Sequence, residues 1–217
     1  MRIVMPSAQM ILPPHYAYVL QLLEFAGKTA YQSEPEIAKE NFLRKIIDKN
    51  HLSVIEHIQI TVRVICDRGV SHEIVRHRIA SYTQESTRYC NYSKEKFGGH
   101  VTFIKPFFFP NIVCGEYKEI NEMPDQNLLT AKERKWLGAV LYSENTYFDL
   151  LNECCSPQEA RCILPISLKT SLVMTMNLRE WKHFFSLRTA PDAHPQMREI
   201  IIPLLKDFQE KYPIVFV

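Results

Sequence analysis

Residues 57–65 read HIQITVRVI, and they carry the clearest strand pattern in the chain. Every second residue from Ile58 to Val64 is apolar, and this period of two predicts a strand buried on one face. Residues 168–177, LKTSLVMTMN, alternate in the same way and predict a second strand. Helical patterns fall around these strands in no regular βαβ order. We therefore predict an α+β fold, with an antiparallel sheet flanked by helices, rather than a doubly wound parallel sheet.

The helices are predicted from periodicity and from capping residues. Ser156, Pro157 and Glu159 suit the start of a short helix as cap, first helical residue and capping-box partner. Asn177, with Glu180 three residues later, predicts the cap of another helix. The expected helices are 33–50, about 71–76, 130–153, one from 156, 178–188 and one after Asp192.

The composition is that of an ordinary soluble protein with a sizeable core, because 46% of the 217 residues are hydrophobic and 23% are charged. No repeat or flexible linker divides the chain, so we expect one domain spanning residues 1–217. Glycines and prolines punctuate residues 90–127, which predicts a loop region with one weak strand candidate, VTFIK. The 26 Lys and Arg nearly balance the 24 Asp and Glu, which gives no general electrostatic case for a nucleic-acid partner.

Residues 3–23 contain no Asp, Glu, Lys or Arg, which raises the question of a signal peptide or a membrane span. Pro6, Pro13 and Pro14 interrupt this run and no small-residue cleavage site stands out, so we expect neither, and no membrane partner. The six cysteines show neither CxxC nor paired ligand spacing. Their pattern predicts reduced thiols in a cytoplasmic protein rather than a disulfide framework.

Two common site chemistries have weak support. Residues 71–77, SHEIVRH, superficially match the zinc helix H-E-x-x-H, but His72 and His77 are five apart. Five positions turn a helix by roughly 140° beyond one full turn, so the two rings would not share a face, and we expect no metal site. Cys66 follows apolar Val64 and Ile65, which indicates packing rather than an activated nucleophile.

Phosphate binding has stronger support. The six glycines, at 27, 69, 98, 99, 115 and 138, cannot form G-x-G-x-x-G or a P-loop, so side chains would have to hold any phosphate. Residues 76–89, RHRIASYTQESTRY, set three arginines among Ser, Thr and Gln, and arginine binds phosphate bidentately. A plain alternative is a solvated basic loop that pairs with Glu73 or Glu85. Similar donors recur later in the chain, at Arg161, Asn177, Arg179, His183 and Arg188.

The stretch 76–89 resembles the signature of flavin-dependent thymidylate synthases, which is R-H-R followed by seven residues and a Ser, here Ser86. The resemblance extends through HLSVIEH upstream and through RCILP, NLREWKHFFSLR and DAH downstream. It implies a homotetramer with FAD sites shared between subunits and with dUMP stacked on the flavin. It also implies methylene transfer from methylenetetrahydrofolate, NADPH as reductant, and no cysteine nucleophile.

The resemblance assigns roles to residues of this chain. Arg188 resembles an arginine beside the pyrimidine, where a cation would favour ionisation at N3 and make C5 nucleophilic. The residues similar to FAD contacts are Ser53, Arg76, His77, Arg78, Gln84, Asn177, Leu178, Arg179 and His183. The residues similar to dUMP contacts are Glu73, Arg76, Gln84, Ser86, Thr87, Arg88, Arg161 and Arg188, with Ser86 and Arg88 near the phosphate.

Some positions are left open. Some family members have Asn and Glu where this chain has Thr83 and Gln84, so a carboxylate contact becomes an amide contact here. The roles of His51, His57 and His194 are not assigned. The leading hypothesis is a cytoplasmic FAD- and NADPH-dependent thymidylate synthase. The alternatives are an inactive flavoprotein scaffold and a single-stranded nucleic-acid-binding module in which nearby tyrosines stack on bases.

Overall fold

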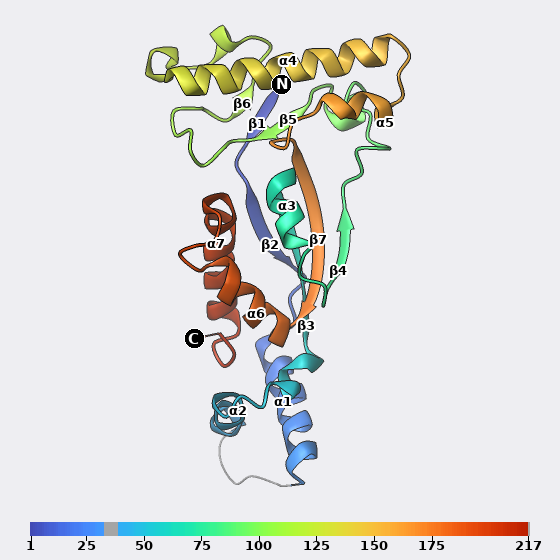
Figure 1. The fold of residues 1–217 in the computed structure, drawn as a ribbon. Helices are drawn as coiled ribbons and strands as arrows, with labels where there is room; N and C mark the ends of the chain where they lie inside the picture. The colour runs from blue at the N-terminus through green and yellow to red at the C-terminus, as the bar shows by residue number, and fades with distance from the viewer. Residues whose placement is uncertain (33–38, 217) are drawn as a thin grey trace. The chain divides into compact units, whose positions relative to one another are not determined.

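The computed structural model describes residues 1–32 and 39–216, and the fold is α+β as predicted (Figure 1). The strands are β1 (Arg2–Val4), β2 (Ser7–Ile11), β3 (Gln59–Asp67), β4 (Ser81–Gln84), β5 (Thr102–Ile104), β6 (Gly115–Glu116) and β7 (Lys169–Asn177). The α-helices are α1 (Tyr16–Tyr31), α2 (Lys39–Asp48), α3 (Arg68–Ile74), α4 (Ala131–Asn152), α5 (Pro157–Ala160), α6 (Leu178–Arg188) and α7 (Pro195–Lys211). The 3-10 helices are η1 (Leu52–His57), η2 (Glu95–Phe97), η3 (Ile120–Glu122), η4 (Gln126–Leu128) and η5 (Arg161–Ile163).

The strands form a four-stranded sheet in the order β2-β3-β7-β4 and a three-stranded sheet in the order β5-β1-β6. The central pair β3 and β7 is antiparallel, since Leu178 N–H donates to the Ile58 carbonyl at 3.0 Å and Thr61 Oγ1 meets Thr175 Oγ1 at 2.9 Å. The sequence predicts one antiparallel sheet, whereas the structure adds a smaller, mixed sheet in which β1 runs parallel to β5 and antiparallel to β6. The long connection between β1 and β5 permits a parallel pair, which a hairpin does not.

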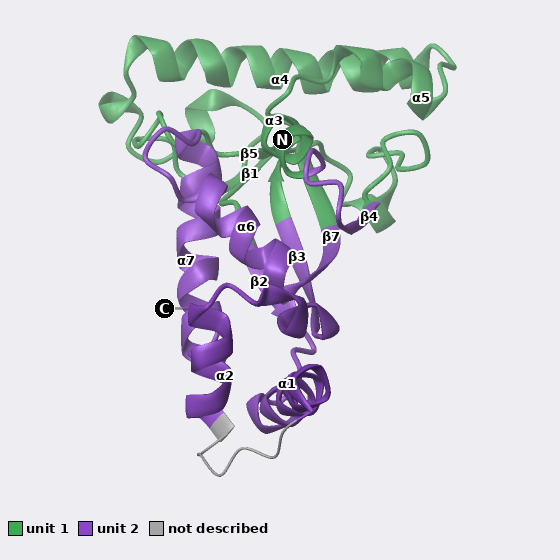
Figure 2. Cartoon of the chain, turned by 60° about the horizontal axis from the view of Figure 1, so that its bottom comes forward, with its two compact units in different colours: residues 1–7, 65–74, 84–172 green, residues 8–64, 75–83, 173–217 purple. Residues whose placement is uncertain are grey.

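The chain divides into two compact units (Figure 2). Unit 1 comprises residues 1–7, 65–74 and 84–172, and unit 2 comprises residues 8–64, 75–83 and 173–217. Strands β3 and β7 contribute residues to both units. The phosphate-binding candidate stretch 76–89 is divided between Thr83 and Gln84, so its two ends belong to different units. The single-domain expectation for residues 1–217 stays a prediction.

The core of unit 1 lies between α4 and the three-stranded sheet. Ile3 and Phe103, register partners on β1 and β5, are buried with Leu137, Val140 and Tyr147 of α4. This burial explains the length of α4, because a long helix needs a continuous apolar face to be stable in water. The predicted helix 130–153 is confirmed, and Thr130 is its N-cap residue.

Glu133 holds the start of α4 and an adjacent loop together. Its carboxylate accepts hydrogen bonds from the backbone N–H and hydroxyl of Thr130 and from the backbone and side-chain nitrogens of Asn111, at 2.6–3.1 Å. Burial alone would raise the pKa of Glu133, but these hydrogen bonds outweigh it and hold the pKa at about 2. The carboxylate is therefore ionised at neutral pH although its residue is 0% exposed.

Replacing Glu133 by Ala is expected to lower the free energy of unfolding by about 2 to 4 kcal/mol, because a helix cap and several buried donors lose their acceptor. The folded-state pKa lies below the unfolded value of about 4.3. The contribution of Glu133 is thus present above about pH 4.3 and is lost as the pH falls toward its folded pKa of about 2. Urea unfolding at several pH values measures both effects. Glu153→Gln, an exposed carboxylate at the other end of α4, is the matched control, and equal midpoints for the two variants would contradict the expectation.

The core of unit 2 is aromatic. Trp181 and Phe185 of α6 stack on each other and both contact Phe208 of α7, with ring centroids 4.9–5.4 Å apart. The Trp181 indole donates to the Ile60 carbonyl at 3.1 Å, which ties α6 to β3. Asn177 caps α6 as predicted, because its side chain accepts from the Glu180 N–H at 2.9 Å. Helix α6 is thereby fixed at its start and along its buried face.

Helix α1 is not among the predicted helices. It packs closely against α2 at Gly27, where a side chain would place its Cβ 2.9 Å from the Phe42 ring. Apolar Tyr18 and Phe25 are exposed on the same helix, so the apolar residues do not mark one face.

The remaining predictions can be compared element by element. The strands 57–65 and 168–177 correspond to β3 and β7, and the helices from 156, 178–188 and after Asp192 correspond to α5, α6 and α7. Helix α2 confirms the later part of the prediction for 33–50, while residues 33–38 lie outside the described residues. Helix α3 begins and ends earlier than the predicted 71–76. Residues 90–127 are mostly loop, with β5 inside VTFIK. No helix in the described ranges is long and apolar enough to cross a membrane.

Candidate functional site

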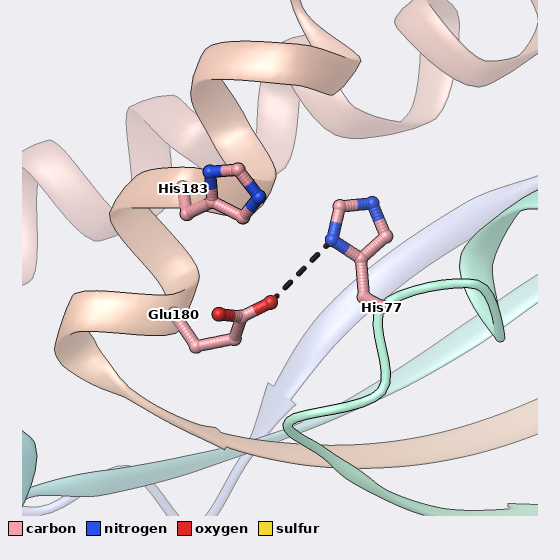
Figure 3. A group of neighbouring side chains, drawn as sticks. All are labelled: His77, Glu180 and His183. Carbon is pink, nitrogen blue, oxygen red and sulfur yellow. Dashed lines mark ion pairs between the residues drawn. The ribbon is translucent and has the colours of Figure 1, made fainter.

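Two predicted site residues of unit 2, Arg188 and His183, converge with Glu180 on the imidazole of His77. The ring is 6% exposed and packs edge-on against Phe184, with centroids 4.8 Å apart. Arg188 Nε donates to His77 Nε2 at 3.0 Å, and Glu180 Oε1 lies 3.5 Å from His77 Nδ1 (Figure 3). His183 approaches from the same helix as Glu180, with its ring centroid 5.9 Å from that of His77. The loop before β4 and both ends of α6 thus supply one cluster.

The protonation state of His77 follows from its surroundings. Burial chiefly, and then the nearby charges of Arg188 and His183, lower the pKa of His77 to about 4. At neutral pH the ring is therefore neutral, so the 3.5 Å approach of Glu180 Oε1 to Nδ1 is a polar contact rather than an ion pair. Burial raises the pKa of Glu180, and His183 partly opposes that rise. His77, Glu180 and His183 also offer donor atoms within 4.8 Å of one another, which is a spacing that suits a metal ion.

A cavity of about 660 Å³ opens beside this cluster within unit 2. Its polar lining includes the predicted FAD contacts Asn177, Arg179 and His183, together with Lys182 and Glu56. Arg179 is exposed and pairs with Glu56, with a 2.6 Å separation between nitrogen and oxygen. The cavity therefore presents cationic and hydrogen-bonding side chains without any glycine-rich loop.

A second polar cluster lies in unit 1 around Gln84. The Gln84 amide donates to Ser71 Oγ at 3.0 Å and to Thr170 Oγ1 at 3.2 Å. Arg68 also donates to the Thr170 hydroxyl, at 3.3 Å. These hydroxyls come from α3 and β7. The side-chain amide of Gln84 can donate to both of them, whereas a carboxylate at position 84 would have no hydrogen to donate.

Glu85 does not neutralise the arginines beside it in the sequence. Its carboxylate pairs with Lys169 at 2.6 Å and accepts from the Tyr92 hydroxyl at 3.4 Å. The alternative of a solvated basic loop that pairs with Glu85 thereby loses that partner.

Two predicted dUMP contacts that are far apart in the sequence meet in unit 1. Arg161 Nη1 donates to the Thr87 hydroxyl at 2.9 Å across a sequence separation of 74 residues. Thr87 is buried, whereas Arg161 and Arg88 are exposed. The Ser86 hydroxyl accepts from the Arg88 backbone N–H at 3.3 Å, which fixes the turn that carries both residues.

The other predicted site residues differ in their exposure to solvent. Arg76, Arg78 and Ser53 are exposed and Glu73 is half-buried. Leu178 is 0% exposed and its N–H donates to the Ile58 carbonyl, so its side chain belongs to the core.

The histidines without an assigned role remain without one. His51 hydrogen-bonds and stacks on Tyr31. His57 ends η1 and His194 precedes α7.

Sequence reasoning missed several members of these clusters. Glu180 was considered only as a helix-cap residue, although its spacing of three from His183 places both on one side of α6. Thr170 and Lys169 lie at the start of a predicted strand, where a polar residue ordinarily signals a solvent-facing position. The further cluster residues without a motif are Ser71, Arg68 and Glu56.

Burial disfavours the thiolate form of three of the cysteines. All six lie in the described part of the chain, and each is unpaired. Burial raises the pKa of the Cys66 thiol to about 12, and burial also raises the pKa values of Cys90 and Cys114. A thiol is nucleophilic as its thiolate, so these three are poor candidates for attack on a substrate.

Comparison with known proteins assigns the chain to a family. The family described as "Thymidylate synthase complementing protein" matches residues 15–214. A flavin-dependent thymidylate synthase of Pyrococcus furiosus is 31% identical over 194 residues, covering 88% of this chain and 72% of that protein. The chain belongs to the flavin-dependent thymidylate synthase family.

Other relatives agree with this membership. The flavin-dependent thymidylate synthase of Mycobacteroides abscessus is 31% identical over 90% of this chain and 77% of that protein. A crystal structure of the UMP/dUMP methylase PolB from Streptomyces cacaoi, bound with 5-Br dUMP, matches with a TM-score of 0.74. That structure covers 100% of this chain and 95% of its own at 20% identity, so it shows the shared fold.

Proposed function

We propose that this chain is a thymidylate synthase that methylates dUMP to dTMP. Methylenetetrahydrofolate would donate the carbon and NADPH the reducing equivalents, and bound FAD would link them. The observation that carries the proposal is the family match over residues 15–214. The polar clusters support it, because predicted ligand contacts that are far apart in the sequence meet in the fold. Arg161 and Thr87, both assigned to dUMP, contact each other, and Arg188, assigned to dUMP, contacts His77, assigned to FAD.

The residues present fit FAD. The cavity of unit 2, about 660 Å³, lies within the range of about 300 to 1,000 Å³ that is usual for small-molecule sites. Arg179 and Lys182 in its lining supply cations for a pyrophosphate, and Asn177 and His183 supply hydrogen-bonding groups. The remaining proposed FAD contacts, by family signature, are Ser53, Arg76, His77, Arg78, Gln84 and Leu178. When bound, FAD supplies the hydride carrier between NADPH and the transferred carbon.

The chain's own contribution to the chemistry is electrostatic. Arg188 is the proposed catalytic residue, because a guanidinium beside the pyrimidine stabilises negative charge at N3 and strengthens C5 as a nucleophile. The dUMP contacts proposed beside it are Glu73, Arg76, Gln84, Ser86, Thr87, Arg88 and Arg161. No thiolate is required, in keeping with the raised pKa of Cys66.

The assembly and location are part of the same proposal. We expect residues 1–217 to act as a single domain, assembled as a homotetramer whose sites are shared between subunits. We expect a cytoplasmic enzyme without a nucleic-acid or membrane partner. Six unpaired cysteines and a net charge of +2 support these expectations.

The direct test is dTMP formation with each component omitted in turn. Purified protein should be yellow and should oxidise NADPH while it methylates dUMP at C5, and omission of folate or flavin should abolish dTMP. Colourless protein that forms no dTMP after reconstitution with FAD would refute the proposal. Bound FAD without turnover would instead indicate an inactive scaffold. Salt-dependent oligonucleotide binding by flavin-free protein would indicate the nucleic-acid-binding alternative.

A further inference from the structure

Glu180 has a polar partner that a helix-cap role does not explain. At the third position of α6 a Glu commonly turns back to the N-cap N–H in a capping box. Here Asn177 caps the helix by accepting from the Glu180 backbone N–H, while the Glu180 carboxylate extends to His77 Nδ1 at 3.5 Å. Both residues are nearly buried, since Glu180 is 8% exposed and His77 is 6% exposed. A carboxylate held out of water in this way is stabilised by a nearby donor, and the Nδ1 side of the His77 imidazole is the polar group that faces it.

The opposite side of the same ring determines which nitrogen carries the proton. Arg188 approaches His77 Nε2 with its Nε–H, at 3.0 Å. A guanidinium can only donate, so Nε2 must accept through its lone pair. The pKa of about 4 keeps His77 neutral at neutral pH. Its single ring proton is therefore on Nδ1, where it faces Glu180.

A metal ion in this cluster is disfavoured by the same contacts. Two histidines and a carboxylate with donor atoms within 4.8 Å form a plausible zinc donor set. A metal-bound imidazole uses one lone pair for the metal and donates its other N–H to an acceptor. For His77 the second nitrogen meets the donor Arg188. Binding a metal at Nδ1 would therefore require loss of the ring proton or of the arginine contact.

We propose that Glu180 is a positioning residue, which fixes His77 in the Nδ1-protonated tautomer so that Nε2 can hold the guanidinium of Arg188. The inference rests on the proposed function, in which Arg188 acts beside the pyrimidine of dUMP. The Glu180 carboxylate acts as the acceptor for the Nδ1–H group, which stays on the ring. This contact sets the tautomer of His77, and the free Nε2 lone pair then holds Arg188 through its Nε–H group. No atom of Glu180 needs to touch substrate.

The test combines two substitutions with a spectroscopic readout. Glu180→Gln keeps a carbonyl oxygen that can accept from Nδ1, whereas Glu180→Leu removes the acceptor, and both retain the backbone N–H that Asn177 caps. The turnover number of E180L, calculated per bound FAD, is expected to fall by about 10- to 100-fold, as for other orienting partners of histidine. The FAD content is measured separately from the visible spectrum, because Glu180 also lines the proposed flavin cavity. E180Q should stay within about threefold of the unsubstituted enzyme, because the acceptor is retained.

Long-range ¹H–¹⁵N spectra of the histidine-labelled holoenzyme report the tautomer itself. The His77 resonances, assigned by their absence in His77→Gln, should show Nδ1 protonated in the unsubstituted enzyme and in E180Q, and a tautomer mixture in E180L. An Nε2-protonated ring in the unsubstituted enzyme would overturn the proposal, whether or not E180L folds. So would full turnover by E180L, equal loss of turnover in E180Q and E180L, or Zn²⁺ binding at one ion per chain that shifts these resonances. Absence of dTMP from the unsubstituted enzyme, with the Nδ1 signature intact, would refute the proposed function and leave the tautomer assignment standing.

Discussion

Replacing Arg188 by Ala is expected to lower the turnover number for dTMP formation by about 100- to 1,000-fold, the loss typical for removal of one preorganised charge or donor from an active site. The guanidinium is fixed by its Nε contact to His77 and therefore does not have to be ordered during the reaction. A fixed cation stabilises charge that develops on the pyrimidine more than it stabilises the neutral ring. The loss should thus appear in kcat more than in the KM for dUMP.

Steady-state kinetics and the visible flavin spectrum test this expectation together. R188A should keep its FAD, because the cations that line the flavin cavity candidate are Arg179 and Lys182. Compared with R188A, Arg188→Lys should recover part of the turnover number, because lysine keeps the positive charge but lacks the guanidinium that contacts His77. Arg44→Ala, an exposed arginine on α2 of the same unit, is the matched control. Turnover by R188A equal to that of R44A would remove Arg188 from the chemistry.

The elements predicted correctly are those whose signals are local. Strand β3 alternates buried and more exposed residues over most of its length, and the predicted caps at Ser156 and Asn177 mark two helix starts that the structure confirms. Parallel pairing of β1 with β5 depends instead on segments about a hundred residues apart. Nothing in either three-residue strand encodes that partner, because register and direction are set by packing of the whole sheet.

The candidate site also combines features that the sequence predicts with features that only the fold shows. The spacing R-H-R identifies the stretch from sequence, but it does not distinguish its members, of which His77 is buried while Arg76 and Arg78 are exposed. Only the fold shows that the histidine faces four residues of α6, which are Glu180, His183, Phe184 and Arg188. Glu180 illustrates most clearly what the sequence does not show. A capping-box residue and a carboxylate partner of His77 are both Glu at this position, so the sequence pattern alone does not distinguish the two roles.

Replacing Arg161 by Ala is expected to raise the KM for dUMP by about 10- to 100-fold with a smaller change in kcat, because one charge-assisted hydrogen-bonding group contributes about 1.5 to 3 kcal/mol. Arg161 begins η5 and is exposed, but its Nη1 is anchored by the buried Thr87 hydroxyl at 2.9 Å. An anchored fork loses less side-chain entropy when it binds an anion than a mobile one does.

The contribution of the Thr87 hydroxyl, which anchors Arg161, can be measured separately from that of the Arg161 charge. Thr87→Ser keeps the hydroxyl and should leave the KM unchanged. Thr87→Val removes the hydroxyl and should raise the KM by about threefold to tenfold, which is less than the loss of Arg161 itself, because the guanidinium keeps its charge and loses only its anchor. Arg134→Ala in the same unit is the control, because Arg134 is also an exposed arginine with a single anchoring bond, to the Gln126 carbonyl at 2.6 Å. If R161A and R134A gave the same KM, Arg161 would be a structural contact of Thr87 alone. If T87V matched T87S while R161A lost affinity, the arginine would bind dUMP without needing its anchor.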